Sequence, residues 1–125
     1  MFRLLIALLL ISSPAFAVEI PLTCDIEIEF NSEGSGIDPA VYSNIMDRIN
    51  ATPAITETYI GNLGHEGERT LCLTVKPDEL GVVYEDLKSY IPEESLRTWT
   101  RIKSRTGAEF KTAPVKGLSR YDWQN

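Results

Sequence analysis

Residues Thr23–Phe30 read Thr-Cys-Asp-Ile-Glu-Ile-Glu-Phe, and from Cys24 onward apolar and acidic side chains alternate without exception. A period of two residues is the pattern of a β-strand with one buried face and one exposed face. The exposed face of this strand would be acidic, since it carries Asp25, Glu27 and Glu29. The rest of the chain is therefore expected to cover the apolar face of this strand and to neutralise the acidic one.

The first 17 residues have the three parts of a secretory signal peptide. Arg3 gives a positive charge, residues 4–11 are an unbroken apolar run, Ser12-Ser13-Pro14 breaks that run, and Ala15-Phe16-Ala17 is a small-x-small cleavage site. The run is too short to span a bilayer, so we expect an exported mature chain from Val18 with no stable membrane insertion. The periplasm is the favoured location and the extracellular medium is the alternative.

The rest of the chain has the length of one domain. We expect a single α+β domain over residues 18–111 and a C-terminal tail over residues 112–125, which show no clear period. The whole chain has a formal net charge of −6. An acidic protein does not suit a phosphate backbone, so no nucleic-acid partner is expected.

Two cysteines, Cys24 and Cys72, predict one disulfide in an exported protein, with two free buried thiols as the alternative. Their spacing, with a single histidine in the chain, matches no metal site. The strand patterns conflict with the disulfide, because Cys24 belongs to the buried face and Cys72 to the exposed face with Thr70 and Thr74. A bulge or a twist before Asp25 would remove this conflict.

The order of elements predicts the architecture. Asp38 and Pro39 provide an N-cap and a first helical residue. Strands two and three are expected to form a hairpin, and a short helical piece could follow the second helix over residues 93–96. Hydrophobic periodicity places strands at residues 18–30, 54–60, 68–75 and 98–104, helices at 39–50 and 77–91, and a short extension or returning strand at 108–111.

Strand, helix, strand, strand, helix, strand is the split β-α-β or ferredoxin-like order. It predicts a four-stranded, antiparallel or mixed sheet with two helices on one face. We expect the first and third strands to be parallel neighbours, and the fourth to lie antiparallel to the first. The acidic residues of the first strand would then lie opposite Arg101, Lys103 and Arg105.

Charge is distributed unevenly along the chain. Residues 18–96 contain 16 acidic and 4 basic side chains, whereas residues 97–121 contain 7 basic and 1 acidic side chain. One interpretation is internal pairing, in which the basic strand neutralises the acidic one. The other is a dipolar surface that steers a protein partner.

Trp99, Arg101, Lys103 and Arg105 share the face that the helices are expected to leave uncovered. Tryptophan among arginines is typical of protein interfaces, so these residues are candidates for binding a partner. Packing of Trp99 under the tail, with Tyr121-Asp122-Trp123 as the cover, is the alternative.

The glycine-rich segment 61–67 connects two expected strands and carries His65 and Glu66. It lacks the Lys-Ser/Thr of a phosphate loop and does not lead into a helix, so phosphate binding is not expected. As an exposed loop it is a second candidate contact for a partner.

These observations favour a non-catalytic protein-binding module that works outside the cytoplasm as an inhibitor, immunity protein or accessory factor. We expect no enzymatic activity, cofactor or metal. One alternative is a small exported hydrolase or ligand-binding enzyme that uses His65 as a general base. Another is a subunit of a secretion or surface assembly, joined by strand addition along residues 54–60.

Overall fold

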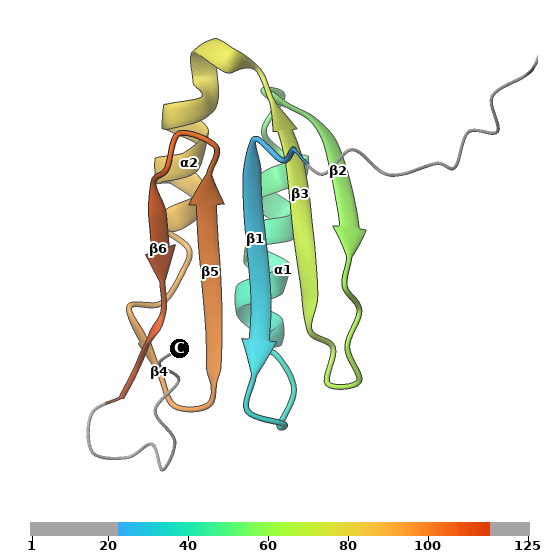
Figure 1. Cartoon of the computed structure of the whole chain (residues 1–125), viewed down its shortest axis with the longest axis vertical. Helices are drawn as coiled ribbons and strands as arrows, with labels where there is room; N and C mark the ends of the chain where they lie inside the picture. The colour runs from blue at the N-terminus through green and yellow to red at the C-terminus, as the bar shows by residue number, and fades with distance from the viewer. Residues whose placement is uncertain (1–22, 116–125) are drawn as a thin grey trace, which may run out of the picture.

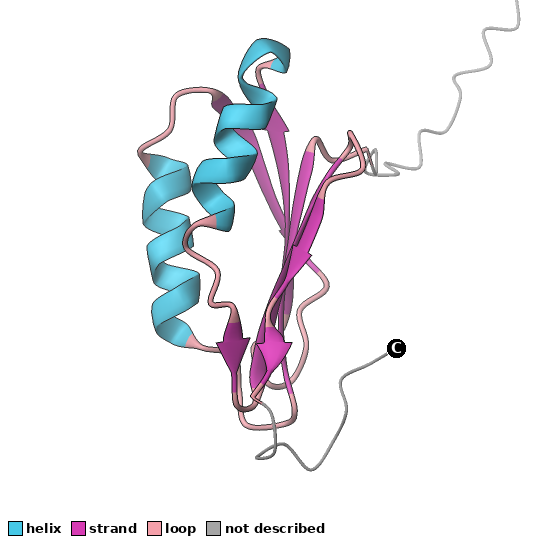
Figure 2. Cartoon of the chain, turned by 90° about the vertical axis from the view of Figure 1, so that its left-hand side faces the viewer, coloured by secondary structure: helices cyan, strands magenta, loops and turns pink. Residues whose placement is uncertain are grey.

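The structure, a computed structural model, describes residues 23–115 and has two layers, a β-sheet and a pair of helices (Figures 1 and 2). The α+β class predicted from the sequence is confirmed. In chain order the elements are β1 (Ile26–Ser32), α1 (Pro39–Asn50), β2 (Ile55–Gly61), β3 (Arg69–Val75), η1 (Pro77–Glu79), α2 (Leu80–Lys88), β4 (Glu94–Ser95), β5 (Thr98–Ser104), β6 (Glu109–Lys111) and β7 (Ala113–Pro114).

The main sheet has five strands in the order β2-β3-β1-β5-β6, and every neighbouring pair is antiparallel. The expected parallel pairing of the first and third strands is therefore wrong. Helix α1 returns the chain so that β2 runs in the same direction as β1, and the β2–β3 hairpin then reverses β3. The expected antiparallel pairing of β5 with β1 is confirmed.

The sheet also has one strand more than the four expected. The short returning strand that residues 108–111 suggested is present as β6, which pairs with β5 and extends the sheet. The helical piece expected at residues 93–96 is wrong, because β4 forms a parallel pair with β7. Backbone hydrogen bonds from Ala113 to Glu93 and from Val115 to Ser95 hold this pair together.

The beginning of the expected tail belongs to the folded domain. Thr112 is only 2% exposed, and its hydroxyl oxygen accepts a hydrogen bond of 3.2 Å from the backbone N–H of Thr100. The proposed signal peptide, residues 1–17, and the segment Tyr121-Asp122-Trp123 lie outside the described residues.

The core lies between the sheet and the helices. Ile26, Ile28 and Phe30 of β1 are almost completely buried, as their alternation predicted. The Phe30 ring meets the edge of Tyr42 at a centroid distance of 5.1 Å. Each helix that hydrophobic periodicity predicted turns an apolar face to the sheet: Val41, Ile45 and Ile49 of α1, and Leu80, Val83, Tyr84 and Leu87 of α2, with Ile91 after it, are buried.

Local signals set the helix beginnings. The Asp38 carboxylate accepts hydrogen bonds from the backbone N–H groups of Ala40 and Val41, at 2.9 and 3.3 Å, and Pro39 is the first residue of α1. This N-cap is the one that the sequence predicted. The second helix begins with the 3-10 turn η1 and continues as α2. Neither helix of the described chain has the length and apolar character that crossing a membrane requires.

Candidate functional site

Within residues 23–115, the helices cover one face of the sheet and leave the other without a helix (Figure 2). We call this second face the open face. Buried and half-buried residues alternate along β1, so the acidic residues of this strand lie on the open face. The strand registers place the following side chains there: Tyr59 from β2, Thr70 and Cys72 from β3, Glu27, Glu29 and Asn31 from β1, Trp99, Arg101 and Lys103 from β5, and Glu109 and Lys111 from β6.

The predicted pairing of acidic and basic strands is present at the centre of the open face. Glu29 lies opposite Arg101, and Glu27 lies opposite Lys103. The Arg101 guanidinium is 2.6 Å from the Glu29 carboxylate and 3.6 Å from that of Glu109. Cross-strand pairs of this kind stabilise a sheet by roughly 0.2–1 kcal/mol each.

The chain bends at Asp25, just before β1 begins, at one end of the open face. The Asp25 N–H donates to the Leu73 carbonyl at 3.0 Å, and its carboxylate accepts from the Val75 N–H at 2.8 Å. The same carboxylate pairs with Arg105 at 3.1 Å. The Asp25 side chain therefore replaces the backbone partner that a regular strand would have offered to Val75.

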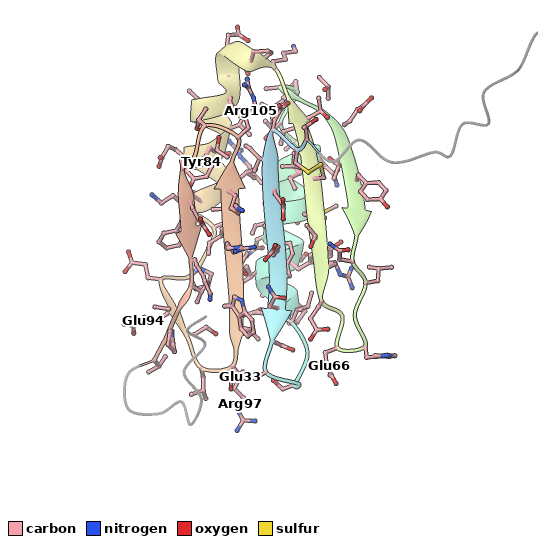
Figure 3. All side chains as sticks on the ribbon, viewed as in Figure 1. Glu33, Glu66, Tyr84, Glu94, Arg97 and Arg105 are labelled. Carbon is pink, nitrogen blue, oxygen red and sulfur yellow. A yellow bond between two sulfur atoms is a disulfide. The ribbon has the colours of Figure 1, made fainter. Side chains whose placement is uncertain are left out.

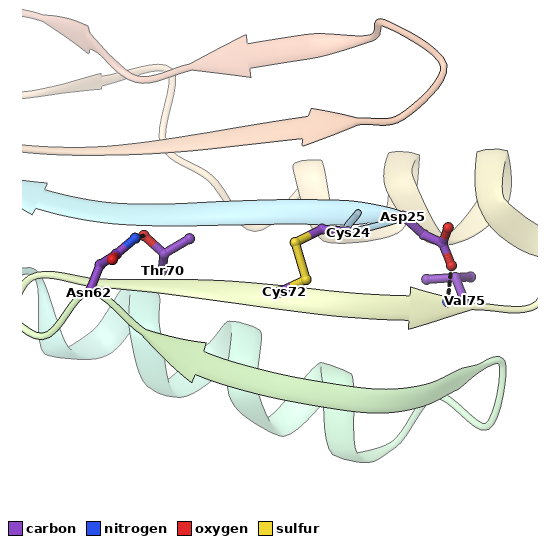
Figure 4. The surroundings of a disulfide bond; sticks show 6 residues. All are labelled: Cys24, Asp25, Asn62, Thr70, Cys72 and Val75. Carbon is purple, nitrogen blue, oxygen red and sulfur yellow. Dashed lines mark hydrogen bonds between the residues drawn. A yellow bond between two sulfur atoms is a disulfide. The ribbon is translucent and has the colours of Figure 1, made fainter. Parts of the chain in front are cut away.

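This bend also explains the disulfide (Figure 4). Cys24 and Cys72 are bonded, with Cα atoms 5.1 Å apart, as the sequence predicted. The conflict of strand faces disappears because regular β1 begins only at Ile26, and the chain before it turns over the open face. The irregularity lies at Asp25 itself. It brings Cys24 to the side on which Cys72 stands.

Glu27 is a titratable group of the open face whose surroundings shift its pKa. Partial burial raises the pKa of Glu27, and so do a hydrogen bond with Glu29 and the negative charge of Glu29. The positive charges of Lys103 and Arg101 oppose this shift. The hydrogen bond with Glu29 raises the pKa of Arg101, so this guanidinium stays charged.

Trp99 lies toward the lower end of β5, opposite Asn31 on β1. Its ring is half-buried, and the Lys111 ammonium is 5.6 Å from the ring centroid, which is within the range of a cation–π contact. An aromatic ring beside basic side chains on a helix-free face is therefore present in the structure. The segment 121–123, proposed as its cover, lies outside the described residues.

The other candidates, His65 and Glu66, are exposed in the β2–β3 loop. Glu66 lies at the end of the molecule opposite Arg105 (Figure 3). Its backbone carbonyl accepts a hydrogen bond of 3.2 Å from Ile37, which attaches the loop to the segment before α1. The predicted residues thus form two separate groups, one along β5 and one in the loop.

Glu109, Lys111 and Tyr59 of the open face were not singled out as contact candidates in the sequence. Glu109 and Lys111 join it because β6 adds to the sheet, and the alternation of charged residues around Phe110 was the available signal. Tyr59 joins it through the β2–β3 register, and the alternation of Glu57 and Tyr59 with threonines could have indicated it.

Other kinds of site have little support within residues 23–115. In this range, no cluster of three or more histidine, cysteine, aspartate or glutamate residues is arranged to hold a metal ion. A shallow hollow on the helical layer is lined by Asn44, Asp47, Arg48, Ala51 and Tyr90. An ion pair of 2.5 Å between Arg48 and Asp86 lies at this hollow and connects the two helices.

No protein-family model, curated protein or solved structure matches this chain.

Proposed function

We propose that this protein is a non-catalytic binding module that docks on another protein through the open face. The observation that carries the proposal is a broad sheet face without helices, on which Trp99, Arg101 and Lys103 lie in a row. Aromatic and arginine side chains are enriched in the centres of protein interfaces.

Ion pairs within the chain neutralise only some of the basic side chains on the open face. Arg101 and Arg105 are occupied by carboxylates of β1, β6 and the Asp25 bend. Lys103 is exposed and, among the described residues, has no carboxylate within ion-pair distance. Lys103 is therefore the charged side chain most able to contact a partner, while the paired charges stabilise the face.

The disulfide supports a location outside the cytoplasm, where such bonds persist. We propose export to the periplasm, with the extracellular medium as the alternative, and an inhibitor, immunity protein or accessory factor as the kind of role. We infer a ferredoxin-like arrangement extended by β6, because β2-β3-β1-β5 has the strand order of that fold.

The hydrolase alternative depends on His65, and no specific observation favours it. An acid–base catalyst needs partners that a rigid frame positions around the substrate. His65 is instead exposed in a loop, where the Gly64 N–H donates to the Glu68 carbonyl at 2.8 Å. For assembly through an edge strand there is a specific observation, because β2 is a seven-residue strand at an edge of the sheet.

Site-specific photo-crosslinking in cells tests the proposal. A benzophenone amino acid at position 99 should capture a partner protein, because it would lie within the contact. The same probe at position 82 is the matched control, since Val82 is 75% exposed on α2, in the helical layer. Capture from position 82 but not from position 99 would contradict the open face as the docking surface.

A second measurement uses the captured partner in vitro. Lys103→Glu should weaken its binding at least several-fold and reduce the salt dependence, because an exposed interfacial charge mainly affects association. Lys76→Glu, a charge reversal at an exposed residue just before η1, should leave binding unchanged. Equal effects of the two substitutions would indicate a general charge effect rather than a contact at the open face.

A further inference from the structure

We propose that two copies of the chain pair through their β2 strands, antiparallel and around a two-fold axis at Tyr59. The proposal goes beyond binding at the open face, because it concerns the edge of the sheet and names a second copy as its occupant.

Strand β2 is an edge strand seven residues long, and β3 is its neighbour in the sheet. No described segment lies along its outer side (Figure 1). Natural proteins protect such edges with lysine, proline or very short strands. The sequence Ile-Thr-Glu-Thr-Tyr-Ile-Gly contains neither lysine nor proline, whereas the opposite edge, β6, has only three residues.

The hydrogen bonds of β3 show which way its backbone groups point. Leu73 accepts from Asp25, and Val75 donates to the Asp25 side chain, so both point toward β1. Directions alternate along a strand, so the N–H and C=O groups of Cys72 between them point toward β2.

The same alternation identifies the free groups of β2. Tyr59 lies opposite Cys72, so its backbone groups point inward to β3. The N–H and C=O groups of its neighbours Thr58 and Ile60 therefore point outward. These four groups per chain are what an added strand would bind.

The register follows from an irregularity in β2. The pairing with β3 shifts between Ile55 and Glu57, which leaves Glu57–Gly61 as the regular part of the strand. Tyr59 is the centre of this segment. Antiparallel pairing of two such segments places Tyr59 opposite Tyr59, Thr58 opposite Ile60, and Glu57 opposite Gly61.

This register is self-complementary in hydrogen bonds and in charge. The Thr58–Ile60 pairs exchange both of their hydrogen bonds, and the two tyrosines form the closer, non-hydrogen-bonded pair. Aromatic cross-strand pairs are favourable, and like charges directly opposite each other are not. Glu57 is the only charged residue of the segment, and it meets a glycine rather than its copy.

Two large side chains of β2 are exposed in the single chain, as expected if a second copy covers this edge. Tyr59 and Ile60 are 47% and 40% exposed. Ile60 lies opposite the buried Leu71 and so faces the helical side, yet it remains open to solvent. A second copy of β2 would cover both side chains.

Pairing of this kind would enlarge the docking surface. The two-fold axis of antiparallel edge pairing is perpendicular to the sheet, so both open faces come to lie on the same side. The dimer would then present one continuous helix-free face made from both sheets.

The first test is the mass of the oxidised protein in solution. Sedimentation equilibrium should show a mass that rises from one chain toward two chains with concentration, at a salt level that screens the net negative charge. Ile60→Lys should keep the protein monomeric, whereas Val82→Lys, at an exposed apolar residue of the helical layer, should dimerise like the wild type. Circular dichroism checks that both variants are folded.

The second test locates the axis. Photo-oxidation should join two chains through a dityrosine bond between the Tyr59 rings, and Tyr59→Phe should abolish this product without changing the mass in sedimentation. Tyr90→Phe is the control, since Tyr90 is 38% exposed near the end of α2. A wild type that stays monomeric, a dimer that survives Ile60→Lys, or a crosslink that survives Tyr59→Phe would each overturn the proposal.

Discussion

Asp25 shows how one side chain can decide the course of the chain. Its carboxylate accepts from Val75 at 2.8 Å and pairs with Arg105 at 3.1 Å. It therefore connects β1 to both of its neighbours at the point where regular pairing stops. The resulting bend is also what allows Cys24 to reach Cys72.

Asp25→Ala should lower the free energy of unfolding by about 1–3 kcal/mol, because the Val75 N–H loses its acceptor. Asp25→Asn is the matched variant. It keeps an oxygen for Val75 but loses the charge that faces Arg105, and partly exposed ion pairs contribute only about 0–1 kcal/mol. Urea unfolding of the three proteins measures both differences. Equal losses in the two variants would show that the charge, rather than the acceptor, is what matters.

The raised pKa of Glu27 predicts that the free energy of unfolding depends on pH. Partial burial raises its pKa in the folded state above the ordinary value of 4.5, with a further contribution from Glu29. Between these two pKa values the folded state binds more protons than the unfolded state, so the stability from this group falls as pH rises through the folded pKa. Glu27→Gln should therefore increase the free energy of unfolding at pH 7 and give no increase below pH 4.5.

Urea unfolding at several pH values checks this prediction. Glu57→Gln is the control, because Glu57 is an exposed glutamate on the same side of the sheet. A stabilisation by Glu27→Gln that is the same at every pH would contradict a titration effect. A loss of stability at pH 7 would show that the attraction between Glu27 and Lys103 is stronger than the cost of burial.

At the scale of elements, the sequence predicted what local patterns control. Alternation defined β5, the Asp38 cap defined the start of α1, and apolar stripes defined the inner faces of both helices. Pairings between distant segments were less accessible. Residues 93–96 could be helical by themselves, and they are not because residues 113–115 provide backbone partners for them.

The candidate site, too, was predictable from the sequence only in part. The opposition of Glu29 and Arg101 followed from the strand order, which survives even though β3 runs in the other direction than expected. Residues 54–60 were expected to be open to strand addition, and β2 does lie at an edge of the sheet. The register shift before Glu57, which centres the regular strand on Tyr59, could not be deduced from the sequence.

Two glycines give a matched test of the elements that contain them. Gly107 has φ +97° in the β5–β6 turn, and its N–H donates to Ser104 at 2.9 Å. Gly107→Ala should cost about 1–2 kcal/mol, because a Cβ atom disfavours this left-handed backbone. Gly81 lies in α2, where an added Cβ atom would meet nothing within 4 Å, so Gly81→Ala should stabilise by up to about 1 kcal/mol.

Thermal and urea unfolding of both variants measures these opposite effects. A destabilising Gly81→Ala would show that the beginning of α2 differs from the described helix. A neutral Gly107→Ala would show that the turn can adopt another conformation at no cost.

At the scale of the whole molecule, charge and covalent structure act on different parts of the protein. On β5, Arg101 is paired with Glu29 of β1 and Lys103 lies opposite Glu27, so the charges at the centre of the open face nearly balance. Much of the remaining negative charge of residues 18–96 lies in the helices and loops. An acidic remainder of this size would speed the approach of a cationic partner, most strongly at low ionic strength.

The disulfide acts on the unfolded chain more than on the folded one. Cys24 and Cys72 are 48 residues apart, and closing a loop of this length removes entropy from the unfolded state that corresponds to about 4 kcal/mol. The sheet around the bridge has its own hydrogen bonds and a buried apolar face, so it should persist without the bond.

Reduction is therefore expected to lower the free energy of unfolding by about 4 kcal/mol while the native circular dichroism spectrum is retained. Urea unfolding with and without reductant measures the change. The double variant Cys24→Ala/Cys72→Ala is the control, because its free energy of unfolding should be the same in both conditions. A loss far larger than about 4 kcal/mol, measured by urea unfolding, would contradict the entropic argument and show that the bridge also supports the folded sheet directly.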